Sequence, residues 1–206
     1  MVERINSREL IQKSLVELLA AKDIDDISVK EIAKNCRMTT RAIYYYFRDK
    51  YDIANSVYLD EMQKYLQSSL RDWYEQMGRF MEQYESFFSH TLTYMGQNCL
   101  ADTIIDLEWE KLRLHIKPEV KSDHEQYFKV MLGIEYMLYG NLGSLRASFV
   151  NGKGLLRTEH GVSYFTSSWD YISEFLSPMV RDSLAALPVH ETAGQTMKVN
   201  CPSQVL

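Results

Sequence analysis

The stretch that decides the fold spans residues 39–50 and reads TTRAIYYYFRDK. It brings together three tyrosines, two arginines and a lysine. A protein core has little use for so many phenol hydroxyls and cations, whereas each of these groups can donate a hydrogen bond to a phosphate oxygen. Duplex DNA carries a dense row of such oxygens. The stretch therefore predicts a helix that contacts DNA.

Capping signals make this helix the second of a pair. Ser28 and Glu31 have the spacing of a capping box, which predicts a helix from Val29 to Asn35. Thr39 is expected to cap the next helix, which runs from Thr40 to Phe47. The four residues 35–38 suit the turn of a helix-turn-helix, in which the second helix presents its N-terminal residues to DNA bases. The alternative is a polar helical hairpin on the protein surface.

The second helix of the pair has an inner and an outer face. Ile43 and Phe47 lie four residues apart and are expected to anchor the helix on the rest of the domain. The side chains expected to point outward are those of Thr40, Arg41, Tyr44 and Tyr45.

Lys50 lies at the start of a further helix, which Asp49 is expected to cap. A cation is disfavoured in the first turn of a helix, because the helix dipole is positive there. A DNA phosphate bound at this N-terminus would explain the lysine. A solvated surface lysine is the alternative.

The charge distribution supports DNA contact in this region alone. The whole chain has a net charge of −5, but residues 28–50 contain six Lys and Arg against two acids, a net charge of +4. Phosphate attraction is screened beyond about 8–10 Å, so a local basic face is sufficient. The acidic remainder is expected to repel DNA elsewhere.

Helical periodicity dominates the rest of the chain, and no alternating strand pattern stands out. Further helices are expected at Ile5 to Ala21, Lys50 to Gln76, Arg79 to Met95, Leu100 to Ile116, Asp123 to Asn151 and Val162 to Ala186, with Gly78 marking a break. Residues 188–206 are polar and aperiodic, which predicts a flexible tail. These patterns predict an all-α fold with a helix-turn-helix domain over residues 1–49 and a helical body over residues 50–187.

Residues 6–58 resemble the DNA-binding domain of TetR-family transcriptional regulators. The family's second helix carries an Ile/Val-x-x-Ile-Ala pattern, which matches residues 29–33, and its Tyr-x-x-Phe-x-x-Lys-x-x-Leu pattern matches residues 44–53 with Ile53 in place of leucine. Arg37 departs from the family, which usually has glycine there. Residues 36–38, 47–52 and 139–143 are similar to one subgroup, the regulators of dihydroxyacetone utilisation and their relatives.

The resemblance assigns roles in DNA contact. Thr40 and Arg41 are expected to read bases. Contacts to phosphates are expected from Tyr44, Tyr45, Tyr46 and Lys50, and Val29 and Thr39 are expected near the DNA backbone. Arg37, which departs from the family pattern, adds a cation near the DNA. The resemblance also implies a homodimer through the last two long helices, because two recognition helices are needed to read half-sites about 34–36 Å apart.

Aromatic residues are concentrated in the body, and family members commonly bind a small effector between such helices. The candidate pocket residues are Phe87, His90, Tyr94, Trp109 and Tyr136. Ordinary core packing is the alternative for each of them. A body that binds another protein instead of a small molecule would make the chain a co-regulator.

The chain lacks enzyme signatures, metal-ligand spacing and a motif for a cofactor. A small enzyme with an incidental basic helix is the remaining alternative. Three scattered cysteines, no apolar membrane span and no signal peptide predict a cytoplasmic protein. The sequence predicts a regulator, usually a repressor, that binds operator DNA as a homodimer and is released by a small molecule.

Overall fold

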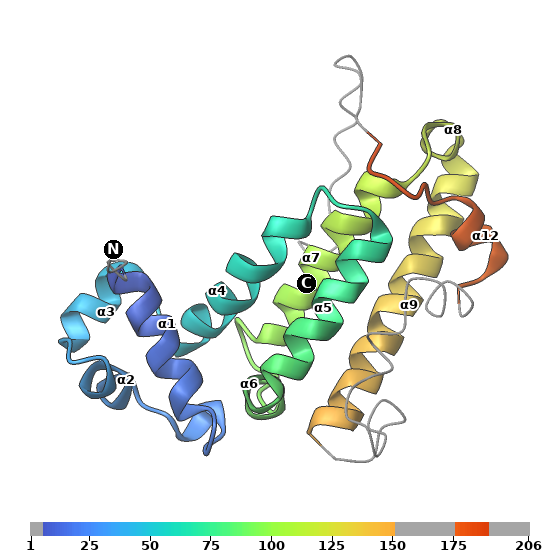
Figure 1. The fold of residues 1–206 in the computed structure, drawn as a ribbon. Coiled ribbons are helices and arrows are strands. Elements are labelled where there is room, and N and C mark those ends of the chain that lie inside the picture. Colours follow the sequence, from blue (N-terminus) through green and yellow to red (C-terminus); the bar gives the residue numbers. More distant parts are fainter. Residues whose placement is uncertain (1–5, 151–175, 190–206) are drawn as a thin grey trace.

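The computed structural model describes residues 6–150 and 176–189 (Figure 1). Within these ranges the chain forms helices and no strand, apart from one isolated antiparallel bridge between Ile116 and Leu184. The predicted all-α class is confirmed. The helices are α1 (Ser7–Leu18), α2 (Val29–Asn35), α3 (Thr40–Tyr46), α4 (Lys50–Met62), α5 (Leu70–Gln83), α6 (Glu85–Thr91), α7 (Leu100–His115), α8 (Pro118–Ser122), α9 (His124–Phe149) and α12 (Pro178–Asp182), with short 3-10 turns η1 (Ile24–Asp26) and η2 (Gln63–Tyr65).

Helices α1, α2 and α3 form a small head at one end of the molecule (Figure 1). Ile11 and Leu15 on α1 are fully buried, which is typical of the inner face of an amphipathic helix. The Ser14 hydroxyl on α1 donates a hydrogen bond to the Ile32 carbonyl on α2 (2.9 Å). Both helices therefore share one small core.

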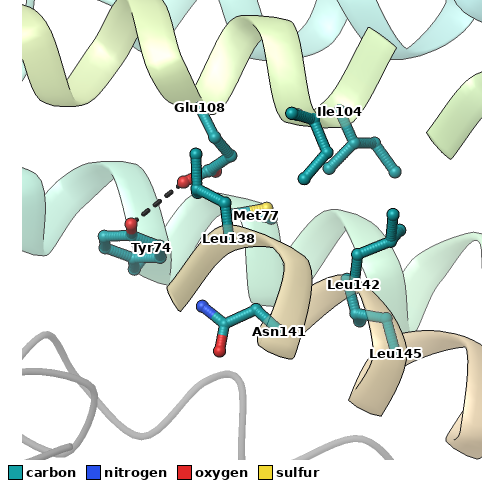
Figure 2. Close-up of a pocket in the computed structure, with 9 residues that line it drawn as sticks. Tyr74, Met77, Ile104, Glu108, Leu138, Asn141, Leu142 and Leu145 are labelled. Atoms are coloured by element: carbon teal, nitrogen blue, oxygen red, sulfur yellow. Dashed lines mark hydrogen bonds between the residues drawn. The ribbon is translucent and has the colours of Figure 1, made fainter. Parts of the chain in front are cut away.

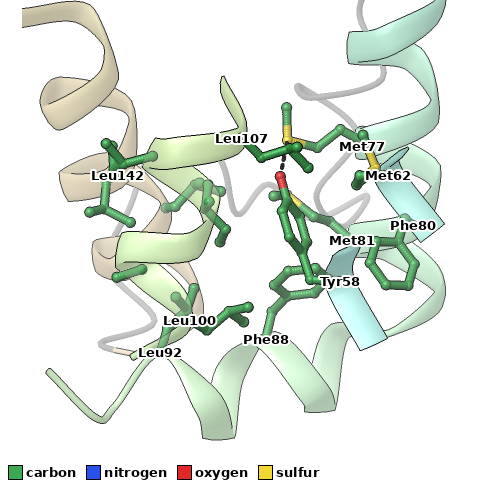
Figure 3. Packing of buried hydrophobic residues seen from close by; sticks show 14 of the residues in the cluster. Tyr58, Met62, Met77, Phe80, Met81, Phe88, Leu92, Leu100, Leu107 and Leu142 are labelled. Carbon is green, nitrogen blue, oxygen red and sulfur yellow. Dashed lines mark hydrogen bonds between the residues drawn. The ribbon is translucent and has the colours of Figure 1, made fainter. Parts of the chain in front are cut away.

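Helix α4 leads from the head into the body (Figure 1). Gln12 on α1 donates hydrogen bonds to Ser56 (2.9 Å) and Asp60 (2.7 Å) on α4, and Arg8 forms an ion pair with the same Asp60. On the body side Tyr58 of α4 is fully buried among the side chains of α5 and α6 (Figure 3). One helix thus belongs to both cores.

The structure corrects the predicted helix from Lys50 to Gln76. The chain leaves α4 through η2, and Ser69 starts α5 by accepting a hydrogen bond from the Asp72 backbone N–H (3.1 Å). Gly78 marks no break, since it is buried within α5. The sequence cannot distinguish a helix break at Gly78 from a glycine buried inside a helix, because glycine also occurs where helices pack closely.

Helices α5, α6, α7 and α9 form the body, with α7 contacting both α4 and α9. Figure 3 shows the core they share, which is rich in aromatic, leucine and methionine side chains. The predicted helix from Arg79 to Met95 is also corrected, because α5 continues to Gln83 and α6 begins at Glu85. Predicted helices from Leu100 and Asp123 agree with α7 and α9 within two residues at each end.

Residues 162–175 of the predicted helix from Val162 to Ala186 lie outside the described part of the chain. Its last part is corrected, because Ser177 and Pro178 start the separate short helix α12. Val189, the last described residue, donates its backbone N–H to the Leu114 carbonyl (2.6 Å). Residues 190–206 of the predicted tail lie outside the described part of the chain.

Candidate nucleic-acid interface and body cavity

The turn between α2 and α3 sets the angle of the helix pair. Met38 N–H donates to the Ala33 carbonyl (2.8 Å) and Arg37 N–H donates to the Lys34 carbonyl (3.2 Å), the two bonds of a Schellman motif. Arg37 has φ 57°, in the left-handed region where glycine is the favoured residue. The chain keeps the turn geometry without glycine, and this places the Arg37 side chain on the exposed surface.

Helix α3 presents the predicted outer face to solvent. Tyr44, Tyr45 and Tyr46 are 57%, 82% and 42% exposed, whereas Ile43 and Phe47 are buried. The Thr39 side chain caps α3 by accepting a hydrogen bond from the Ala42 backbone N–H (3.1 Å). The predicted anchors and cap are confirmed in the free chain.

The cations around α3 are available at the surface. Arg37 and Arg41 are exposed, and Arg41 lies in the first turn of α3 beside the half-buried Thr40. Arg48 forms an exposed pair with Asp52 (3.3 Å), and this hydrogen bond and charge raise its pKa. Val29, in the first turn of α2, is half-buried. Contacts of these residues to DNA stay predictions.

The Lys50 ammonium has partners that the sequence did not indicate. It donates to the backbone carbonyls of Asp25 (2.9 Å) and Ile27 (3.0 Å), which hold the segment before α2 against the start of α4. A phosphate at the α4 N-terminus would therefore share this lysine with two carbonyl oxygens. The surface-lysine alternative is wrong as stated, because the side chain is bonded within the head.

Three contacts join the head to the body next to α3 and α4. His90 on α6 lies 2.6 Å from the Asp23 carboxylate in the segment before α2. Tyr94 stacks on Tyr51 of α4 at 4.0 Å between ring centroids. Asn98, with φ 64°, donates to the Asp49 carboxylate that caps α4 (3.3 Å). The sequence gave no signal for this joint, because its partners lie far apart along the chain.

Comparison with known proteins agrees with this geometry. The model of the family described as "Bacterial regulatory proteins, tetR family" matches residues 11–57, which cover most of the head and the start of α4. The match is confined to the N-terminal part of the chain, and it shows a DNA-binding domain of the TetR type there. The helix-turn-helix of this domain is formed by α2 and α3.

One curated relative is the uncharacterized HTH-type transcriptional regulator YxbF of Bacillus subtilis (strain 168), 28% identical over 94 residues. The match covers 38% of this chain and 24% of that protein, so the chain spans about a quarter of its relative. The dihydroxyacetone kinase operon activator DhaS has a similar fold, with a TM-score of 0.51 at 14% identity, covering 86% of this chain and 98% of DhaS. A TetR transcriptional regulator from Rhodococcus sp. RHA1 also has a similar fold, with a TM-score of 0.50 at 13% identity, covering 84% of this chain and 99% of that regulator.

The five predicted pocket residues lie in different environments, and their role in ligand binding stays a prediction. Phe87 is buried in the core, while His90 and Tyr94 face the head as described above. Trp109 is half-buried and stacks with Arg113, and Tyr136 is 74% exposed on α9. Aromatic content alone could not separate core, joint and surface positions, since each position favours the same side chains.

A cavity does exist in the body, between α5, α7 and α9 (Figure 2). None of the predicted pocket residues lines this cavity. Glu108, the residue before Trp109, lines this cavity and is buried. A carboxylate three residues from a lysine on an amphipathic helix gives no sequence signal of burial.

Two absences hold for residues 6–150 and 176–189, the part of the chain that the structure describes. In that part of the chain no group of three or more His, Cys, Asp and Glu side chains could hold a metal ion. None of the described helices combines the length and apolarity that a membrane crossing requires.

Proposed function

We propose that this regulator binds operator DNA as a homodimer, represses transcription from the DNA it occupies, and is released when a small molecule binds in its body. The observation that carries the proposal is the surface of α3, where exposed tyrosines and Arg41 stand on buried anchors. The N-terminal half of α3 supplies base contacts and the tyrosines supply phosphate contacts.

The proposed dimer uses the outer face of α9. Its apolar side chains Phe128, Leu132, Tyr136 and Tyr139 are 41–74% exposed, which is unusual for a solvent-facing helix. Gly140 and Gly143 extend the same face, and no described atom lies within 4 Å of a Cβ placed on either. A second copy of α9 could approach closely at these glycines.

The test of DNA binding is affinity for the DNA upstream of the gene, compared with unrelated DNA, across a salt series. Tighter binding to the upstream DNA with a steep salt slope is the expected result. Arg41→Ala should relax base preference at one position by about 1–3 kcal/mol, and Tyr44→Phe should weaken binding to all sequences. Arg79→Ala is the matched control, because it removes one exposed cation from α5 in the body.

The test of the dimer is sedimentation of Gly140→Leu beside the unaltered chain. The added side chain meets open space in one protomer, so folding should be retained, while close packing of two α9 helices should be lost. A variant that is folded and still dimeric would place the interface elsewhere. Equal, weak binding of the unaltered dimer to all DNA would oppose the proposed operator.

Release by a ligand requires that the ligand prefer one arrangement of the two heads. Helix α4 is the element through which the body can move the head, because it contributes to both cores. A crosslink that fixes the head spacing should abolish the response to a ligand. An unchanged response would refute this route.

A protein partner is the second candidate for the body, and the narrowness of the cavity favours it. The space at its centre is about 20 Å³, enough for a water molecule and little more. A protein that binds the body and alters DNA affinity, with no effect from small molecules, would favour the co-regulator function.

A further inference from the structure

The cavity between α5, α7 and α9 combines an apolar lining with one buried acid. Six of its nine lining residues are Ile, Leu or Met. The three polar residues are Glu108 on α7, Tyr74 on α5 and Asn141 on α9, and Figure 2 shows them at one end of the cavity. A site with an apolar wall and a few convergent polar groups is the usual form of a small-molecule pocket.

Glu108 is 4% exposed and only partly satisfied. One of its oxygens accepts a hydrogen bond from Trp73 Nε1 (2.7 Å) and the other accepts one from the Tyr74 hydroxyl (2.9 Å). An ionised carboxylate has about four acceptor positions, so about two remain for a ligand. Burial raises the pKa of Glu108 to about 7, although the two hydrogen bonds and Lys111 oppose the rise.

No cation among the described residues forms a salt bridge with Glu108. Lys111 lies one turn further along α7, but its ammonium donates to the backbone carbonyls of Leu66 (3.0 Å) and Ser68 (2.5 Å). Within residues 6–150 and 176–189, the negative charge of Glu108 is therefore buried without a direct counter-charge. Such a charge is costly, and a cation that enters the cavity would remove much of that cost.

We propose that the effector of this regulator is a small organic cation, a protonated amine with a compact apolar body, whose ammonium group binds Glu108. This inference rests on the proposed release by a small molecule. The ammonium donates to the open acceptor positions of Glu108, while the apolar part contacts Met77, Leu138 and Leu142.

Binding of such a ligand must move the body, because the central space holds about one water molecule. The ligand has to separate α9 from α5 and α7, and a shift of α7 carries Lys111 with it. Lys111 holds the chain that connects α4 to α5, so the shift reaches the helix that carries the head. Occupancy of the cavity is thereby linked to the position of α4.

Calorimetry on the full chain at about pH 8 tests the proposal, with benzylammonium, the neutral benzyl alcohol and the anionic benzoate as probes of similar shape. Benzylammonium should bind at least about tenfold more tightly than benzyl alcohol, which corresponds to one charge-assisted hydrogen bond. Benzoate should not bind. Glu108→Gln should abolish the preference for the cation, whereas Glu110→Gln, an exposed neighbour with the same charge change, should keep it.

A second measurement uses the unaltered chain alone. Its affinity for benzylammonium should rise between about pH 5 and about pH 8, since Glu108 becomes ionised over this interval. Equal binding of cation and alcohol, a preference that survives Glu108→Gln, or no binding of benzylammonium would overturn the proposed ligand class. DNA affinity measured without any probe is independent of these results, so failure of the ligand class remains distinct from failure of DNA binding.

Discussion

Glu108→Gln should make the protein more stable at alkaline pH and leave its stability unchanged at acidic pH. The amide can replace both hydrogen bonds, because its oxygen can accept from Trp73 Nε1 and its nitrogen can donate to the Tyr74 hydroxyl oxygen. The variant therefore has the shape and the neutrality of the protonated glutamic acid. It differs from the unaltered chain only where Glu108 is ionised.

The expected size of the effect follows from the pKa of Glu108, which burial raises from 4.5 to about 7. The folded chain holds this proton more tightly than the unfolded chain does. The free energy of unfolding therefore falls as the pH rises from 4.5 to about 7, and the loss is complete above that pH. A pKa difference of this size corresponds to about 3 kcal/mol, which the variant should recover at about pH 8.

Urea unfolding followed by circular dichroism measures the free energy of unfolding at about pH 4.5 and about pH 8. One protein concentration is used throughout, because the proposed dimer would contribute to stability. Glu110→Gln serves as the control, since its carboxylate is exposed. If Glu108→Gln is less stable than the unaltered chain at alkaline pH, the buried carboxylate stabilises the fold. That result would also remove the basis for a cationic ligand.

Three further variants test the turn, the head and the α4–α5 connection. Arg37→Gly should raise the free energy of unfolding by about 1 kcal/mol, because glycine adopts the left-handed backbone of this position without strain. The same variant should lower the salt slope of DNA binding by about 1. Unchanged stability would contradict backbone strain at Arg37. Lys50→Ala should lower the stability measured by thermal unfolding by about 1 kcal/mol, because the carbonyls of Asp25 and Ile27 lose their hydrogen-bond donor. If the salt slope of DNA binding stays the same in this variant, Lys50 does not contact a phosphate. Lys111→Met should cost about 2 kcal/mol in urea unfolding, because half-buried carbonyls of the α4–α5 connection lose a donor whose side chain is fully buried. An unaffected variant would refute its anchoring role.

The sequence was sufficient to predict local structure where a side chain bonds to a residue one helical turn away. Ser28 with Glu31, Thr39 with the Ala42 N–H and Asp49 with the Asp52 N–H are all caps that span three residues, and all three form as predicted. Their partners are fixed by covalent distance along a helix, so the pattern carries the geometry. The helix-turn-helix and its outer face follow from these local rules together with apolar spacing.

Tertiary structure decided everything that depends on where distant segments meet. Lys50 bonds to carbonyls more than twenty residues away, and Glu108 is enclosed by side chains from α5 and α9. No local pattern distinguishes a buried glutamate from a solvated one, because burial depends on the path of the whole chain. The sequence by itself determined a DNA-binding head on a helical body, whereas packing alone decided which acid faces the cavity and which contacts join the body to the head.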